Sequence, residues 1–130
     1  RGSANLDIDF FLLDENRHYP AKATFRQQAT IDVSISNFRF DMPLFQVADA
    51  DGESRKSLYV GDGPETLKRY SPDTKRLFSR KSEKLKFALP RDARRVKVFD
   101  VNGDGKEDLI LPFDTQEEQR LRNQLHILLN

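Results

Sequence analysis

A nine-residue loop, Asp-Val-Asn-Gly-Asp-Gly-Lys-Glu-Asp at positions 100–108, constrains this chain more than any other stretch, and the apolar run Leu-Ile-Leu follows it directly. Side-chain oxygens occupy the first, third, fifth and ninth places of the loop, and glycines occupy the fourth and sixth. Because glycine turns without a Cβ penalty, alternate side chains can converge on one point. Oxygen ligands at this spacing suit a hard cation such as Ca²⁺. The alternative is a polar turn before a strand, since Asp, Asn and Gly also dominate ordinary turns.

The ligands predicted by this pattern are the side chains of Asp100, Asn102, Asp104 and Asp108 and the main-chain carbonyl of Lys106. An EF-hand continues to a bidentate Glu at the twelfth place and is bracketed by helices, whereas the twelfth place here is Leu111. The loop instead ends at its ninth place and runs straight into a predicted strand. In this it resembles the FG-GAP or VCBS repeat, the calcium-loop blade of integrin alpha-chain heads and of many secreted bacterial proteins. The resemblance covers these ligand positions one for one and implies Ca²⁺ as the bound ion.

A second stretch aligns with this loop at a spacing of 109 − 58 = 51 residues, with Leu58 placed on Leu109. The aligned pairs are Asp49 with Asp100, Asp51 with Asn102, Gly52 with Gly103, Glu53 with Asp104, and Ser57 with Asp108. The earlier loop has a longer acidic arm at its fifth place, Ser54 in place of a glycine, and a neutral hydroxyl at its ninth place. Fewer charges and a stiffer turn weaken the binding of a divalent cation. We therefore expect Asp49, Asp51 and Glu53 either to form a second, weaker site or to leave it empty, with the two aspartates holding the turn.

Alternating apolar positions predict β-strands along the whole chain. The predicted strands are residues 6–14, 21–27, 30–36, 37–41, 58–60, 66–70, 76–79, 84–89, 109–113 and 124–129. Residues 119–129 also carry leucines at helical spacing, but the resembled family has the second strand of a blade at this place, so a strand is preferred. The sequence thus predicts an all-β fold whose strands fall into two sets of four and a final two.

Four strands make one propeller blade, so the resemblance implies antiparallel four-stranded blades of a β-propeller, about two and a half of them. A chain of 130 residues is one domain and is short for a ring of four or more blades. The approximate repeats are residues 1–48, 49–99 and 100–130, and residues 1–3 resemble a vector remnant. Because an open set of blades leaves strand edges unpaired, we expect a piece of a larger propeller or one closed by oligomerisation.

Composition excludes several classes of protein. Hydrophobic residues make up 37% and charged residues 33% of the chain, and no apolar run approaches the roughly 18 residues that indicate a membrane helix, so we expect no membrane span. The absence of cysteine excludes disulfides, zinc–thiolate sites and thiol catalysis. The chain has 2 histidines, His18 and His126, and neither a Gly-x-Ser-x-Gly motif nor a Walker-type phosphate loop. We therefore expect no enzyme.

Positive charge is concentrated in the middle of the chain, where residues 54–97 carry 14 basic and 5 acidic side chains. The basic stretch 55–97 could bind a polyanion, such as a polysaccharide or nucleic acid, through sulfate or phosphate contacts. Strands on the outer rim of a blade also carry solvating charges that oppose edge-to-edge aggregation. Because no nucleic-acid fold signature accompanies the charge, we favour the solvated rim and keep polyanion binding as the alternative, with nucleic acid the less expected partner.

The resemblance implies a non-catalytic, calcium-binding segment of a β-propeller that serves adhesion, recognition or scaffolding. The family is found in extracellular, periplasmic and cell-surface proteins, and calcium loops of weak affinity fill at the calcium concentration outside cells. The expected partner is a protein or carbohydrate ligand whose identity the sequence leaves open. A homo-oligomer, the remainder of a larger propeller and the accessory part of a longer enzyme are open as well.

Overall fold

The computed structural model describes residues 2–33, 43–113 and 121–130, and within them it contains nine β-strands and one short 3-10 helix. The strands are β1 Gly2–Phe10, β2 Phe25–Val33, β3 Phe45–Ala48, β4 Ser57–Gly61, β5 Thr66–Tyr70, β6 Glu83–Lys86, β7 Lys97–Phe99, β8 Asp108–Pro112 and β9 Leu125–Leu128, and the helix spans Ala93–Arg95. They form three antiparallel sheets with the orders β1-β2, β3-β4-β5-β6 and β7-β8-β9. Neighbouring strands are consecutive in sequence, so each sheet is a simple meander.

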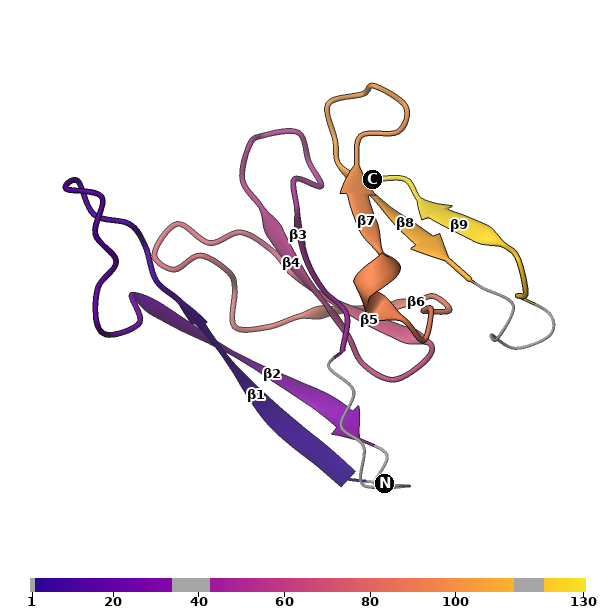
Figure 1. The fold of residues 1–130 in the computed structure, drawn as a ribbon, viewed down its shortest axis with the longest axis horizontal. Helices are drawn as coiled ribbons and strands as arrows, with labels where there is room; N and C mark the ends of the chain where they lie inside the picture. The colour runs from indigo at the N-terminus through magenta and orange to yellow at the C-terminus, as the bar shows by residue number, and fades with distance from the viewer. Residues whose placement is uncertain (1, 34–42, 114–120) are drawn as a thin grey trace.

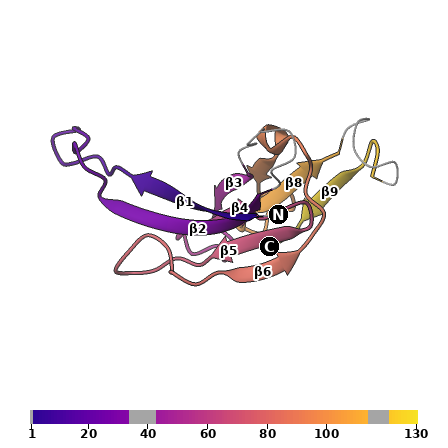
Figure 2. The same cartoon turned by 90° about the horizontal axis from the view of Figure 1, so that it is seen from below.

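The four-stranded sheet lies between the other two sheets (Figures 1 and 2). Every residue of β4 is buried. Leu58 and Val60 pack in a core shared with the β1–β2 hairpin, whereas Tyr59 packs in a second core shared with the β7–β9 sheet. Because successive side chains of a strand point to opposite faces, a strand with a core on both sides needs apolar residues at consecutive positions, as β4 has.

The β1–β2 hairpin has one apolar and one polar face. Residues of β1 alternate between half-buried and exposed, and the half-buried Leu6, Ile8 and Phe10 pack on the first core. A sheet with this pattern covers a core on one side and meets water on the other. The hairpin therefore closes one end of the stack.

The structure confirms an all-β, antiparallel fold. The strand predicted at residues 66–70 coincides with β5, and the preference for strand over helix near the C-terminus is confirmed by β9. Residues 15–17 form a turn in the β1–β2 connection, where Arg17 has a positive φ of 63°. Gly2 and Ser3 belong to β1 and pair with Val33 and Asp32 of β2.

The prediction of a buried strand over residues 6–14 is wrong at its C-terminal end. The hairpin closes at Phe10, whose carbonyl accepts the Thr24 N–H at 2.8 Å. The apolar residues that follow are in a loop and are nearly half exposed, namely Phe11, Leu12 and Leu13 at 44%, 45% and 46%. Asp14 stabilises this loop by accepting the His18 N–H at 2.8 Å, so local hydrogen bonding outweighs the apolar pattern.

The strand predicted at residues 21–27 is wrong at residues 21–24, which lie outside any strand, and its remainder joins the described part of the strand predicted at 30–36 in the single strand β2. Residues 76–79 form only an isolated bridge between Pro72 and Phe78. Two strands were missed, β3 and β7, because runs of four and three residues show too little alternation to be recognised. The strand predicted at 37–41 lies outside the described residues.

These differences change the grouping of strands. The prediction of two sets of four and a final two is replaced, in the part of the chain that the structure describes, by sets of two, four and three. Each set has two edge strands, so none of these sheets closes on itself. Among the described residues one sheet has four strands, and it begins one strand earlier than predicted because β3 belongs to it.

Substitution of the buried leucines at the start of β4 and β8 tests both cores. Leu58 and Leu109 are 2% and 0% exposed, so Leu58→Ala and Leu109→Ala are each expected to lower the free energy of unfolding by about 2–5 kcal/mol. Leu125, which is 58% exposed on β9, is the matched control, and its replacement by Ala is expected to change stability by less than about 0.5 kcal/mol. Urea unfolding followed by circular dichroism measures all three, and equal losses at the three sites would contradict the assigned cores.

Candidate metal centre

Both candidate calcium loops lie at the same edge of the molecule (Figure 1). The loop that begins at Asp100 connects β7 to β8, and the one that begins at Asp49 connects β3 to β4. Each loop therefore joins neighbouring strands of one sheet. The strands that follow the loops are aligned in the same way as the loops. The strand β4 runs from Ser57 to Gly61, and β8 runs from Asp108 to Pro112, so both ends of the two strands are separated by the same number of residues as the loops.

The Asp100 carboxylate organises its loop by accepting backbone amides. Its Oδ1 accepts the N–H of Gly103 at 2.8 Å and of Asp104 at 3.2 Å, and its Oδ2 accepts the Gly105 N–H at 2.9 Å. Gly103 and Gly105 have φ values of +73° and +83°, a left-handed backbone that is costly for residues with a Cβ. The predicted need for glycine at the fourth and sixth places is thus met by the observed backbone.

The Asp49 loop repeats this geometry. Asp49 Oδ1 accepts the Gly52 N–H at 2.8 Å, and Oδ2 accepts the Ser54 N–H at 2.8 Å, three and five residues ahead as in the later loop. Burial raises the pKa of the Asp49 carboxyl, but the amides of Ser54 and Gly52 outweigh it and hold that pKa below its ordinary value. Ser54 adopts a φ of +62° where the later loop has glycine, so this turn is strained at its sixth place.

Asp108 differs from the other predicted ligands because it is fully buried, at 0% exposure. Its Oδ2 accepts the Val101 N–H at 3.0 Å, and its Oδ1 accepts the Asn130 N–H at 2.9 Å. The Asp108 carboxylate therefore connects Val101, at the start of the loop, to Asn130, which lies two residues after the end of β9. Ser57, at the equivalent place, is also buried, but has a single hydroxyl oxygen.

Glu107 connects the two loops and was not singled out by sequence reasoning. Its N–H donates to the Asp49 carbonyl at 2.7 Å, and its Oε1 accepts the Asp49 N–H at 2.8 Å. The same oxygen forms a short ion pair with Lys56. The hydrogen bond from Lys56, followed by that from Asp49, holds the pKa of the Glu107 carboxyl below its ordinary value. A signal was present in the sequence, because Lys56 and Glu107 are opposite charges at equivalent positions of the two aligned loops.

The donor set of the Asp100 loop fits calcium in its chemistry, since it offers only oxygen. Asn102 and Asp104 are exposed, and Asp104 Oδ1 accepts the Lys106 N–H at 2.9 Å. Across residues 2–33, 43–113 and 121–130, no three or more His, Cys, Asp or Glu side chains are grouped closely enough to hold a metal ion. The loop carboxylates of Asp100, Asp104 and Asp108 accept backbone amides, and a cation would use the oxygen lone pairs that those amides leave over.

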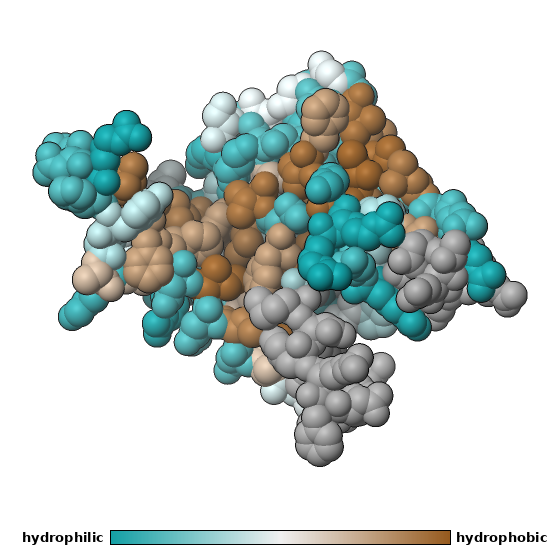
Figure 3. Space-filling model, in the orientation of Figure 1, coloured by the Kyte–Doolittle hydropathy of each residue, from teal (hydrophilic) through white to brown (hydrophobic). Residues whose placement is uncertain are grey.

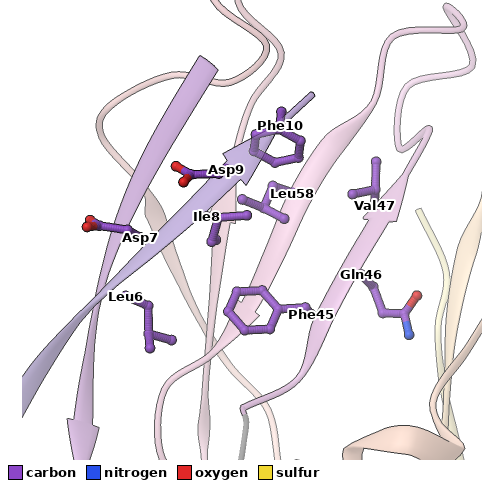
Figure 4. Close-up of a pocket in the computed structure, with 9 residues that line it drawn as sticks. All are labelled: Leu6, Asp7, Ile8, Asp9, Phe10, Phe45, Gln46, Val47 and Leu58. Atoms are coloured by element: carbon purple, nitrogen blue, oxygen red, sulfur yellow. The ribbon is translucent and has the colours of Figure 1, made fainter. Parts of the chain in front are cut away.

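Apolar side chains dominate the cleft between β1 and the four-stranded sheet. This cleft of about 470 Å³ is lined chiefly by Leu6, Ile8, Phe10, Phe45 and Leu58. Asp7 and Asp9 of β1 point away from Phe45 and Leu58 (Figure 4), so the two carboxylates do not converge on the cleft. Its lining is suited to packing against another apolar group.

The two histidines lie apart from the candidate metal centre in the fold. His18 is exposed in the β1–β2 connection. His126, on β9, stacks at a tilt on Phe113 with ring centres 4.8 Å apart, and its Nε2 lies 2.9 Å from Gln124 Oε1. Neither is grouped with the loop carboxylates.

Part of the basic stretch is used inside the protein. The Lys68 side chain is mostly buried, pairs with Asp62 at 3.1 Å and donates to the Thr30 carbonyl of the hairpin. A separate groove of about 420 Å³ is lined by aromatic rings and by four basic residues. These basic residues are Arg26, Lys75, Arg76 and Arg80. Arg26 belongs to β2 and pairs with Asp9 at 2.7 Å, so the stretch itself combines a structural lysine with a small basic surface of Lys75, Arg76 and Arg80.

Comparisons with protein-family models, with curated proteins and with solved structures gave no match to this chain. The resemblance to calcium-loop repeats thus rests on the loop residues alone. In the described ranges, no helix has the length and apolar character needed to span a membrane.

The contacts that Glu107 makes with Asp49 and Lys56 predict that removing the Glu107 side chain lowers the free energy of unfolding more than removing the Lys56 side chain does. Glu107→Ala removes the acceptor of the partly buried Asp49 N–H and is expected to cost about 1–3 kcal/mol. Lys56→Ala removes only a partly exposed ion pair and is expected to cost less than about 1 kcal/mol. Glu53→Ala, which removes an acidic side chain 67% exposed in the equivalent loop, is the control and is expected to be nearly neutral. Chemical denaturation of the three variants checks the order, and a Glu107→Ala variant as stable as Glu53→Ala would refute the link.

Proposed function

We propose that this chain is a non-catalytic, calcium-stabilised segment of a β-propeller of the FG-GAP or VCBS type, acting in adhesion, recognition or scaffolding outside the cell or at its surface. The observation that supports the proposal most is the repeated loop geometry. Asp49 and Asp100 accept amides from the residues three and five places ahead, and the strands on either side of the two loops occupy equivalent places in their sheets. Two independent polar turns would have no reason to share this placement, bonding and oxygen pattern.

The three stacked sheets support the propeller part of the proposal. Two of them carry a candidate loop between their first and second strands, and both are antiparallel meanders. We take the four-stranded sheet as one complete blade, the β7–β9 sheet as part of the next, and the hairpin as part of the one before. Neighbouring blades in a propeller pack face to face, which is the arrangement of the cores on either side of β4.

Calcium would stabilise the folded conformation of the Asp100 loop. Asp100, Asn102, Asp104 and Asp108 would supply side-chain oxygens, and Lys106 its carbonyl. The ion would neutralise repulsion among the three carboxylates, of which Asp104 is the most exposed and forms the fewest hydrogen bonds. The Asp49 loop, with a strained Ser54 and a neutral Ser57, would bind calcium more weakly. The surface that recognises a protein or carbohydrate partner would then lie away from the two loops.

The calcium proposal predicts a change in thermal stability. At calcium concentrations about tenfold above a dissociation constant of roughly 10⁻⁴–10⁻³ M, the native state should gain about 1–2 kcal/mol relative to chelator. Asp104→Ala should abolish most of this gain while leaving the melting temperature in chelator nearly unchanged. Glu15→Ala, in the exposed β1–β2 connection, should retain the full gain, and Asp51→Ala should retain most of it. Differential scanning calorimetry with calcium and with EDTA measures each case, and melts that do not differ between the two solutions would refute calcium binding.

A second candidate function, polyanion binding by the basic stretch 55–97, is favoured by the groove that gathers Lys75, Arg76 and Arg80 beside Arg26, whose guanidinium pairs with Asp9. If it operates, wild-type protein should be retained on heparin at low salt and released steeply as salt rises. The Lys75→Gln/Arg80→Gln double variant should elute at clearly lower salt, whereas Lys106→Gln, which removes a lysine from the calcium loop, should elute with wild type. Wild-type protein that flows through the column at low salt would exclude this function.

A further inference from the structure

A second cleft, with a volume of about 630 Å³, lies between the four-stranded sheet and the β7–β9 sheet, and we call it the Arg69 cleft. Leu85 and Phe87 line it on one side, and Leu111, Ile127 and Leu128 line it on the other. Figure 3 shows apolar side chains gathered over β8 and β9, the strands that form the second wall. Small-molecule sites are clefts of roughly 300–1,000 Å³ that are mostly apolar and contain a few polar groups. The size and the lining of the Arg69 cleft fit this description.

Arg69 of β5 is the only arginine or lysine among the described residues that line this cleft. The residue is half-buried, and its Nε is buried without a hydrogen-bond partner. None of the ion pairs between described residues includes Arg69. Glu83, which lies opposite Arg69 in the register of β5 and β6, is exposed and does not line the cleft. A partly buried charge without a partner costs free energy, so an anion bound to this guanidinium would stabilise the folded protein.

The tyrosine and the asparagine of the Arg69 cleft already bond to protein groups. The Tyr59 hydroxyl donates to Asn130 Oδ1 at 3.4 Å, and Asn130 Nδ2 donates to the Glu107 carbonyl. Burial raises the pKa of the Tyr59 hydroxyl, so this group stays neutral at neutral pH. No aspartate or glutamate is among the described residues that line the cleft. One unpaired positive charge in an apolar surrounding complements a ligand with one anionic group and an apolar body, whereas a polyanion would need several cations.

We propose that the Arg69 cleft binds a small amphipathic carboxylate, with the carboxylate group on the Arg69 guanidinium and the hydrocarbon part along Leu85, Leu111 and Leu128. The planar guanidinium offers parallel N–H donors that match the two oxygens of a carboxylate. Removal of the hydrocarbon part from water supplies affinity in proportion to the apolar area that is buried. This binding activity goes beyond a calcium-stabilised propeller, because Arg69 lies on β5, outside both candidate calcium loops.

Isothermal titration calorimetry of the 130-residue chain in EDTA, with sodium octanoate as the probe, tests the proposal. Wild type is expected to bind octanoate about tenfold more tightly than 1-octanol, because only the carboxylate bonds to the guanidinium. Arg69→Gln is expected to lose this tenfold preference and to keep its affinity for 1-octanol, which reports an intact cleft. Arg80→Gln, which removes an arginine from the separate basic groove, is the matched control and is expected to bind octanoate as wild type does. Shortening the probe to hexanoate should weaken binding by about tenfold.

Three results would overturn the proposal. The first is a wild-type protein that does not bind octanoate at millimolar concentration, which would assign the cleft to another occupant such as a further β-strand. The second is equal affinity of wild type for octanoate and 1-octanol, and the third is a folded Arg69→Gln variant that binds octanoate as tightly as wild type. Should Arg69→Gln fail to fold, Arg69→Lys decides the matter, because loss of the planar fork is expected to weaken the binding of octanoate and not of 1-octanol. Unchanged octanoate binding by that variant would count against the assigned contact.

Discussion

The burial of β4 on both of its faces is the constraint on which the rest of the structure depends. A strand with Leu58 and Val60 on one side and Tyr59 on the other requires an apolar cover for each face of its sheet. A two-stranded hairpin is by itself at best marginally stable in water, and the β7–β9 sheet buries Leu109 and Leu111 in the core that it shares with the middle sheet. The hairpin and the β7–β9 sheet therefore owe their stability to the middle sheet, and the middle sheet owes its double burial to them. This mutual dependence explains why a chain of short strands can form a cooperative unit.

Polar contacts fix how the three sheets are aligned, a task that apolar packing performs poorly because it has little directionality. At the loop edge, Glu107 and Asp49 exchange two hydrogen bonds that align the β7–β9 sheet with the four-stranded sheet. On the other side of the middle sheet, Lys68 reaches the Thr30 carbonyl of the hairpin. Each contact satisfies a backbone group that would otherwise lose its hydrogen bond with water. The stack is thus held by apolar cores and oriented by a few directional bonds.

The sequence predicted the elements whose signal lies within a few neighbouring residues. It missed the features that depend on contacts with other parts of the chain. The β5 strand and the left-handed glycines 103 and 105 were predictable, because alternation and turn chemistry act over a few residues. The end of β1 was not, since Phe11 and the leucines after it look like core but are drawn into a loop closed by Asp14. The three-residue strand β7 is defined only by pairing with β8. Glu107 was overlooked because its role depends on contact with a loop that is distant in the sequence.

The structure also distinguishes the side-chain oxygens that close the turn from the side-chain oxygens that the turn does not need. In the Asp49 loop, two amide bonds to Asp49 and a third from the Glu53 N–H to Asp51 Oδ1 at 3.1 Å close the turn, even with Ser54 in a strained conformation. In the Asp100 loop the same closure is present, and Asn102 and Asp104 add little to it, with single amide contacts at 3.4 Å and 2.9 Å. The exposed Asp104 carboxylate places a second negative charge in the same loop as Asp100, which the turn does not require. A cation would offset the repulsion between these charges, and for this reason we regard the surplus oxygens of the later loop, more than its glycines, as the argument for calcium.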